Sequence, residues 1–227
     1  GATVPLQHSD DNETGLLATL GFRMGSKKTY AIEGSVFVTG ATVQWLRDGL
    51  GVISNGPQTV DMAMAVDSNE GVYFVPAFVG LGAPHWQPDA TGSITGLTRG
   101  SDKNHIVRAA LESTAYQVKD VVDAMEAGRS RSIQSIRADG GQSDNPFVMQ
   151  FQADMLDRPV EVARVTETTA LGAAFLAGRG VGLWKSDAEI ESMWKASAIY
   201  EPSMRESERN SLYSGWLEAL RRTLPRI

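Results

Sequence analysis

Residues 137–147, RADGGQSDNPF, indicate the fold most directly, because they contain the end of one element, a turn and the start of another. The apolar run 133–138 predicts a β-strand. Two glycines follow it, and Asn145 and Pro146 are typical of a helix start, since asparagine caps a helix and proline fits its first turn. A strand that passes through a glycine turn into a helix is a unit of α/β domains.

Patterns on both sides of this stretch predict more strands and helices. Strands are expected at 16–23, 29–37, 72–78, 133–138 and 159–163. Helices are expected at 40–50, 101–127, 147–156 and 166–178, then from the capping boxes at Ser186 and Ser203. The glycine-rich segment 79–100 predicts a long loop, and Gly128 a helix end. The alternation in the second half indicates an α/β domain with a mixed sheet flanked by helices.

The composition is that of a folded protein, and it excludes several kinds of site. The chain has 227 residues, of which 42% are hydrophobic and 21% charged, enough for one large domain or two small ones. Its net charge of −6 gives no reason to expect nucleic acid or an acidic membrane as partner. The absence of cysteine excludes disulfides and thiolate chemistry. No apolar run is long enough for a membrane span, and the start, Gly1 rather than methionine, suggests a fragment.

The glycine turn is also the first candidate site. A glycine such as Gly141 lets the backbone approach a ligand closely, and the helix start beyond it offers free N–H groups that favour an anion. Ligands of open α/β sheets lie at such strand ends. A tight turn without a ligand gives the same pattern, so both interpretations stay open on spacing alone.

The segment GSITGLTRGSDKNHIVRAALE, residues 92–112, has mainly a structural interpretation. Gly96 and Gly100 shape a turn, and the alanines allow close helix packing. Glu112 is either a buried partner or a surface charge. The three histidines have no metal-ligand spacing, and no G-x-x-x-x-G-K-[ST] loop is present. His85 and Trp86 are interpreted as packing or domain-contact residues.

This same segment resembles the signature of the carbohydrate kinases that phosphorylate glycerol, xylulose, gluconate and fucose. Other stretches are similar to the glycerol kinases in particular, so the resemblance covers nearly the whole chain. They are YAIEGSVFVTGATVQWLRD (30–48), VYFVPAFVGLGAPHWQPDATGSITGLTRG (72–100), DGGQSDNPFVMQFQADML (139–156), TETTALGAAFLAG (166–178) and ERNSLYSGW (208–216). One departure is Thr91, where the family commonly has arginine.

The resemblance implies two actin-like domains of the ribonuclease H type with ATP between them. Residues 1–227 would be the carboxy-terminal, nucleotide-binding domain, without its first strand. The matching motifs imply that Gly40 and Gln44 line the nucleotide site and that Gly141 and Asn145 contact the adenosine end. Asp139 is interpreted as a residue that shapes the turn.

The resemblance also implies the reaction. The complete enzyme would transfer the γ-phosphate of ATP, with Mg²⁺, to glycerol, giving glycerol 3-phosphate and ADP. No catalytic or metal-binding residue is assigned here, since the family's base lies upstream, and the chain alone is expected to be inactive. Glycerol, the missing amino-terminal domain and further copies of the protein are the expected partners, in the cytoplasm. The alternatives are a sibling sugar kinase and a non-catalytic actin-like nucleotide-binding module.

Overall fold

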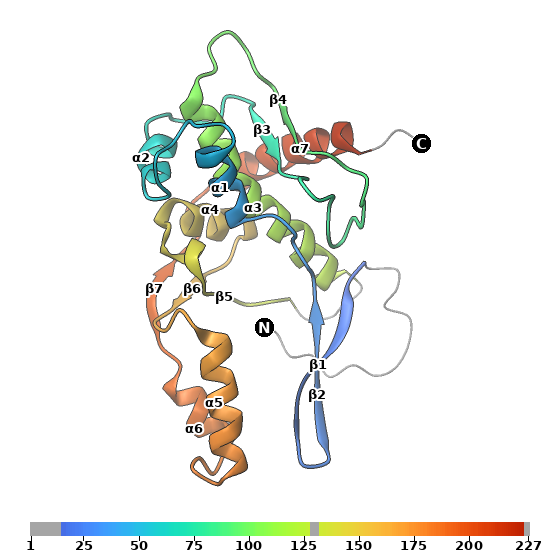
Figure 1. Cartoon of the computed structure of the whole chain (residues 1–227), viewed down its shortest axis with the longest axis vertical. Helices are drawn as coiled ribbons and strands as arrows, with labels where there is room; N and C mark the ends of the chain where they lie inside the picture. Colours follow the sequence, from blue (N-terminus) through green and yellow to red (C-terminus); the bar gives the residue numbers. More distant parts are fainter. Residues whose placement is uncertain (1–14, 128–131, 225–227) are drawn as a thin grey trace.

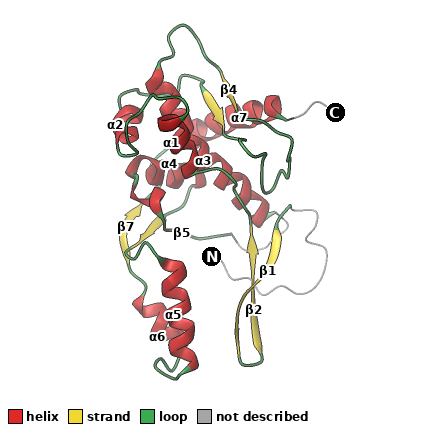
Figure 2. Cartoon of the chain, in the orientation of Figure 1, coloured by secondary structure: helices red, strands yellow, loops and turns green. Residues whose placement is uncertain are grey.

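The computed structural model describes residues 15–127 and 132–224, which form three small sheets and a group of helices (Figures 1 and 2). Two of the sheets are antiparallel pairs, and the third has the order β5-β6-β7, with β5 parallel and β7 antiparallel to β6. The strands are β1 (Leu17–Met24), β2 (Lys27–Glu33), β3 (Tyr73–Val75), β4 (Ser93–Thr95), β5 (Ile136–Ala138), β6 (Val160–Ala163) and β7 (Ala196–Tyr200). The fold is therefore mixed α/β, but with three short sheets.

One long central helix, α3, contacts α1, α2, α4 and β3. The helices of the described residues are α1 (Gly40–Asp48), α2 (Gln58–Met64), α3 (Lys103–Glu126), α4 (Pro146–Leu156), α5 (Thr168–Gly180), α6 (Asp187–Met193) and α7 (Glu206–Thr223), with a 3₁₀ turn, η2 (Gly141–Asp144), before α4. In the part of the chain that the structure covers, no helix has the length and apolar character of a membrane span.

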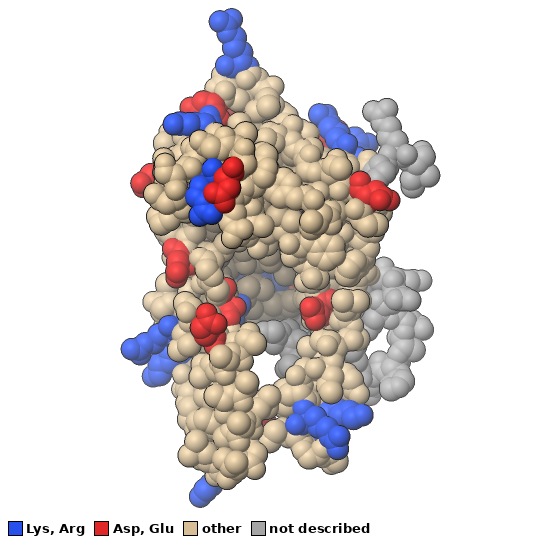
Figure 3. Space-filling model, in the orientation of Figure 1, with Lys and Arg blue, Asp and Glu red and all other residues tan. Residues whose placement is uncertain are grey.

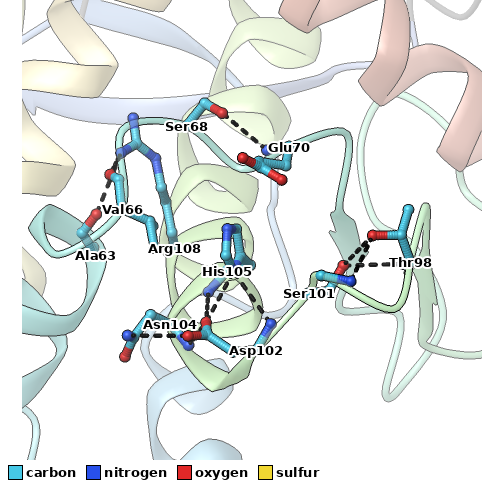
Figure 4. Close-up of polar contacts among 11 residues, drawn as sticks. Ala63, Val66, Ser68, Glu70, Thr98, Ser101, Asp102, Asn104, His105 and Arg108 are labelled. Carbon is cyan, nitrogen blue, oxygen red and sulfur yellow. Dashed lines mark hydrogen bonds and ion pairs between the residues drawn. The ribbon is translucent and has the colours of Figure 1, made fainter.

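A capping box starts the central helix (Figure 4). The Asp102 carboxylate accepts the backbone N–H groups of Asn104 and His105 at 2.8 and 3.3 Å, and His105 Nδ1 lies 3.2 Å from the Asp102 backbone nitrogen. The box satisfies N–H groups that the first turn of a helix leaves free, so α3 begins at a defined residue.

The main core lies between α3, α4, β3 and α7. Trp216 of α7 is fully buried and stacks on Tyr116 of α3, with ring centroids 5.3 Å apart, and Phe151 of α4 meets Tyr116 edge-on at 5.5 Å. Asp120 of α3 accepts hydrogen bonds from Trp216 Nε1 at 3.0 Å and from the Tyr213 hydroxyl at 2.6 Å. The helix α7 is therefore part of the core.

Arg108 and Glu112 of α3 hold the end of α2 (Figure 4 shows the arginine). Arg108 donates to Glu112 at 2.8 Å and to the carbonyl groups of Ala63 and Val66, and Asn69 donates to the other Glu112 oxygen at 2.8 Å. Burial raises the pKa of Glu112, and the hydrogen bond from Arg108 opposes that rise. Glu112 is thus a buried partner of Arg108 and not a surface charge.

Two arms extend from this body, the β1–β2 hairpin and the α5–α6 pair (Figure 1). The helix α5 is rich in small residues, yet Gly178 is its only buried residue among those described. Gly178 lies against the Trp184 ring, which leaves no space for a Cβ atom. Small residues permit close packing, but a second element must also lie against them.

Several predicted boundaries also need correction. The second strand ends at Glu33 rather than 37, and the next residue, Gly34, lies so close to the side chain of Val121 that a Cβ atom there would overlap it. Segment 79–100 contains β4, and α2 and β7 were not predicted. The predicted end at Gly128 lies outside the described residues.

The two predicted caps behave differently. Ser186 caps α6, where its hydroxyl accepts the Glu189 N–H at 3.2 Å. The capping box at Ser203 is wrong, because the N–H and hydroxyl of Ser203 both donate to Asp154, at 2.6 and 3.1 Å. The helix α7 therefore begins three residues later, at Glu206.

Glu126 joins the end of α3 to the start of the third sheet. Its ionisation should make the stability of the protein depend on pH. Its carboxylate accepts Arg158 at 2.6 Å and the Ile133 N–H at 2.6 Å, and the Arg158 hydrogen bond is the main cause that lowers the pKa of Glu126. A lowered pKa in the folded state gives stability that is present at neutral pH and is lost as pH falls through that pKa. We expect Glu126→Gln to cost about 1 kcal/mol at pH 7, less than a buried charged pair because both side chains are partly exposed.

Urea unfolding of both proteins at several pH values measures this effect. The difference is expected to be constant from pH 6 to 8 and to shrink below the ordinary glutamate pKa of 4.5. Glu70→Gln, at an exposed position, is the matched control. A difference that stays the same down to pH 3 would show that the charge of Glu126 does not contribute.

Candidate functional site

A cavity of about 720 Å³ lies where three segments that are far apart in the sequence meet. One wall is the start of α1, the second is the lead-in and first turn of α2, and the third is the turn between β5 and α4. The lining residues are Thr39, Gly40, Val43, Gln44, Gly56, Pro57, Thr59, Val60, Asp139, Gly140, Gly141, Gln142, Asp144 and Asn145. The four residues that the sequence singled out, Gly40, Gln44, Gly141 and Asn145, are all among them.

The turn after β5 is the glycine turn from which the sequence analysis started. Gly140 has φ +82°, a conformation that favours glycine, and its carbonyl accepts the Ser143 hydroxyl at 2.6 Å. Gly141 is exposed, and a Cβ atom added there would meet no atom within 4 Å. This open space agrees with the expectation that a ligand can approach the backbone at Gly141.

Asn145 ends this turn and caps α4. Its Oδ1 accepts the Val148 N–H at 3.1 Å, and Pro146 occupies the first helical position, as expected. The side chain is partly exposed and lines the cavity. Its cap role fixes one end of the amide, so the other end is available to a neighbour or a ligand.

The start of α1 lies opposite this turn. A Cβ atom on Gly40 would lie 4.0 Å from Cγ of Gln142, so the two segments approach at van der Waals distance. Gln44 is one turn further along α1 and is exposed, with its side chain at the cavity. Leu46, on the other side of α1, is fully buried and packs with α2 and α3, which holds this wall in place.

The α2 wall was missed by the sequence analysis. Thr59 is fully buried, and its hydroxyl donates to the Gly56 carbonyl at 2.6 Å. The segment Asn55-Gly56-Pro57 is a turn signal followed by a proline suited to a helix start, so it could have predicted α2. The link between Thr59 and the third wall is a tertiary contact that no local pattern shows.

The charges at the cavity are acidic. Among the described lining residues there are two carboxylates, Asp139 and Asp144, and no lysine or arginine. Asp139 accepts the hydroxyl of Thr168, the first residue of α5, which agrees with a role in shaping the turn. Such a lining suits a neutral polar group with hydroxyl or amino donors better than a phosphate.

No cluster of three or more metal-binding side chains occurs within residues 15–127 and 132–224. On the face shown in Figure 3, basic and acidic side chains are interspersed in small groups. The charged surface of this face therefore does not single out another site.

His85 and Trp86 lie away from the cavity, where His85 is partly exposed and Trp86 is exposed. His85 Nε2 is 2.9 Å from the Asp120 carboxylate, and Trp86 Nε1 donates to the Gly15 carbonyl at 2.6 Å. Trp86 also meets Phe37 edge-on, with ring centroids 6.0 Å apart. Packing is therefore the role that the structure shows for them. Trp45 similarly packs against Phe74 and Phe78.

Comparisons with known proteins agree on one family. Residues 3–181 match the FGGY family of carbohydrate kinases, C-terminal domain. Glycerol kinase 2 of Thermotoga maritima is 54% identical over 214 residues, and glycerol kinase of Caldanaerobacter subterraneus subsp. tengcongensis is 52% identical over 213. Each alignment covers 94% of this chain and 43% of the relative, so the chain spans less than half the length of these proteins.

A solved structure gives the same result for the fold. The crystal structure of Plasmodium falciparum glycerol kinase with ADP is 35% identical, with a TM-score of 0.86, and the match covers 94% of this chain and 43% of that one. The fold is therefore that of the actin-like kinases, as expected from the resemblance. The chain belongs to the FGGY family of carbohydrate kinases and contains its C-terminal domain.

Proposed function

We propose that residues 1–227 are the nucleotide-binding domain of an ATP-dependent glycerol kinase. The observation that carries this proposal is the convergence of Gly40, Gln44, Gly141 and Asn145 on one cavity. Gly40 and Gln44 belong to one sequence motif, and Gly141 and Asn145 belong to another that is distant along the chain. That the solved relative contains ADP, as its description states, supports the same ligand class.

The cavity suits the adenosine end of the nucleotide. Val43, Pro57 and Val60 give it an apolar surface, and Asp139 and Asp144 can accept hydrogen bonds from hydroxyl or amino groups. The open space at Gly141 lets the ligand approach the backbone. Because the lining described here is acidic, we propose that the phosphates extend out of the cavity toward the amino-terminal domain.

The chemistry then depends on both domains. Mg²⁺ carried by the nucleotide phosphates would neutralise charge on the transferred phosphoryl group. This chain would hold and orient the nucleotide, and the residue that takes the proton from the glycerol hydroxyl would come from the amino-terminal domain. We propose the cytoplasm as the location and a homo-oligomer as the assembly, with glycerol as the substrate.

A phosphotransfer assay on the intact protein that contains this chain tests the proposal. We expect ADP release only when glycerol, ATP and Mg²⁺ are all present, with one glycerol 3-phosphate formed for each ADP. We expect the 227-residue chain alone to give no turnover. Xylulose, gluconate and fucose serve as alternative substrates at matched concentration.

Each other outcome has a definite meaning. Turnover with one of the sugars in place of glycerol would identify a sibling carbohydrate kinase. ADP binding by the intact protein without turnover on any substrate would indicate a non-catalytic nucleotide-binding module. Glycerol-dependent turnover by the 227-residue chain would contradict the division of labour between the domains.

A further inference from the structure

Thr59 and Asn145 connect two walls of the cavity through one chain of hydrogen bonds. The Thr59 hydroxyl donates to the Gly56 carbonyl at 2.6 Å, and Asn145 Nδ2 donates to the same hydroxyl oxygen at 3.3 Å. At its other end, Asn145 accepts the Val148 N–H at 3.1 Å. The chain therefore runs from the lead-in of α2 to the first turn of α4.

The direction of this chain is fixed by its first bond. A hydroxyl has one proton, and the proton of Thr59 goes to a carbonyl, which can only accept. Thr59 must therefore accept from Asn145, which requires the amide nitrogen rather than the oxygen on that side. The oxygen then faces the Val148 N–H, which can only donate. The amide of Asn145 is held in one of its two orientations by both neighbours.

The Asn145 amide keeps hydrogen-bonding groups that these two bonds do not use. An amide group has two N–H donors and an oxygen with two acceptor sites, and among the residues that the structure describes each end has one partner. One donor and one acceptor remain on a side chain that lines the cavity. Without the Thr59 hydroxyl, only the cap to α4 would hold the orientation.

We propose that Thr59 is a positioning residue, which orients the Asn145 amide for the nucleotide without touching the nucleotide itself. The inference rests on the proposed function, because it assumes that Asn145 contacts the ligand. Thr59 is fully buried, so its hydroxyl is unavailable to solvent and serves these two bonds.

A double-mutant cycle for ADP binding, measured by calorimetry on the intact protein, tests this role. Thr59→Val has nearly the same shape but no hydroxyl, and we expect it to weaken ADP binding about 3- to 10-fold, the effect of one lost hydrogen bond. Thr59→Ser keeps the hydroxyl and is expected to match the wild type. In an Asn145→Ala background, Thr59→Val should add nothing, because Thr59 acts through the amide.

Kinetics give a readout that a merely structural role would not produce. In Thr59→Val we expect a higher KM for ATP with unchanged kcat and KM for glycerol. Asn145→Asp serves if Thr59→Val does not fold, since it keeps the cap oxygen but places a second acceptor against Thr59. It should weaken ADP binding at least as much as Thr59→Val.

The outcomes separate this inference from the proposed function. Absence of ADP binding by the wild-type protein would overturn both. Normal binding by the wild type with an unchanged Thr59→Val variant would overturn the positioning role alone. Equal effects of Thr59→Val in the presence and absence of Asn145, or a Thr59→Ser variant as weak as Thr59→Val, would overturn it as well.

Discussion

Replacing Gly141 by valine is expected to weaken the binding of ADP and ATP by the intact protein strongly while leaving its folding intact. The backbone of Gly141 is not in the left-handed region, and an added Cβ would meet nothing within 4 Å. The valine therefore fits the folded protein, and its side chain occupies cavity space that we assign to the nucleotide. The variant changes the site rather than the scaffold.

The size of the effect follows from packing. Forcing extra atoms into an occupied contact costs about 1–3 kcal/mol, which is roughly 5- to 150-fold in Kd. Displacement of the nucleotide from the neighbouring Asn145 adds to this loss. Calorimetry with ADP measures it, and Gly141→Ala, with a smaller side chain, should fall between the wild type and the valine variant.

Gly180→Val is the matched control. Gly180 ends α5, is exposed, and also has no atom within 4 Å of an added Cβ, but it is not among the lining residues of the cavity. The control should bind ADP as the wild type does. Unchanged ADP affinity in Gly141→Val would show that the nucleotide binds elsewhere.

The second large effect is on stability, at Asp120. Its carboxylate is buried and lies within hydrogen-bond distance of three partners from two other segments: Tyr213 and Trp216 of α7, and His85. Burial and the Asp120 carboxylate both raise the pKa of Tyr213, so its hydroxyl stays protonated and donates. Asp120→Ala leaves the N–H of the fully buried Trp216 without its acceptor.

We expect Asp120→Ala to destabilise the protein by about 3–5 kcal/mol, as when one partner of a buried polar network is removed. For a domain of this size, that lowers the Tm by roughly 6–20 °C. Scanning calorimetry of the intact protein measures the change. Asp123→Ala is the control, since Asp123 is on the same helix but exposed, and its pair with Lys119 should contribute within about 0.5 kcal/mol.

Asp120→Asn refines the result. The amide keeps one oxygen acceptor but presents a donor on its other side, so an intermediate loss of stability is expected. If Asp120→Ala and Asp123→Ala lower the Tm equally, Asp120 does not have the central role described here.

The sequence predicted the elements with strong local signals and missed those without them. The central helix α3 has a long apolar face, and α4 has an asparagine cap and a proline, so both were predicted within a few residues. The helix α2 has 7 residues and β4 has 3, which is too short for a periodic pattern. Ser203 has the spacing of a cap, but Asp154, distant in sequence, binds it instead.

The residues of the candidate site also differ in whether a local sequence signal indicates them. Local chemistry indicated Gly141 as a close-approach glycine and Asn145 as a helix cap, because a glycine turn before a helix start is visible in eleven consecutive residues. Their contact with adenosine was implied by the family resemblance. Gly40 and Gln44 came from the family resemblance, since nothing local connects α1 to that turn. Thr59 could not be predicted at all, because its role depends on Asn145, which folding alone brings near.

The position of α7 affects how the chain can fold as it is made. The family match ends at residue 181, yet Trp216 and Leu220 fill the centre of the main core. During synthesis, α3, α4 and β3 leave the ribosome long before the helix that covers them. Their apolar faces stay exposed until α7 is made, and exposed apolar surfaces can bind chaperones or associate prematurely. The main core therefore cannot be complete before α7 has been made, and a boundary drawn at residue 181 would divide a single hydrophobic core.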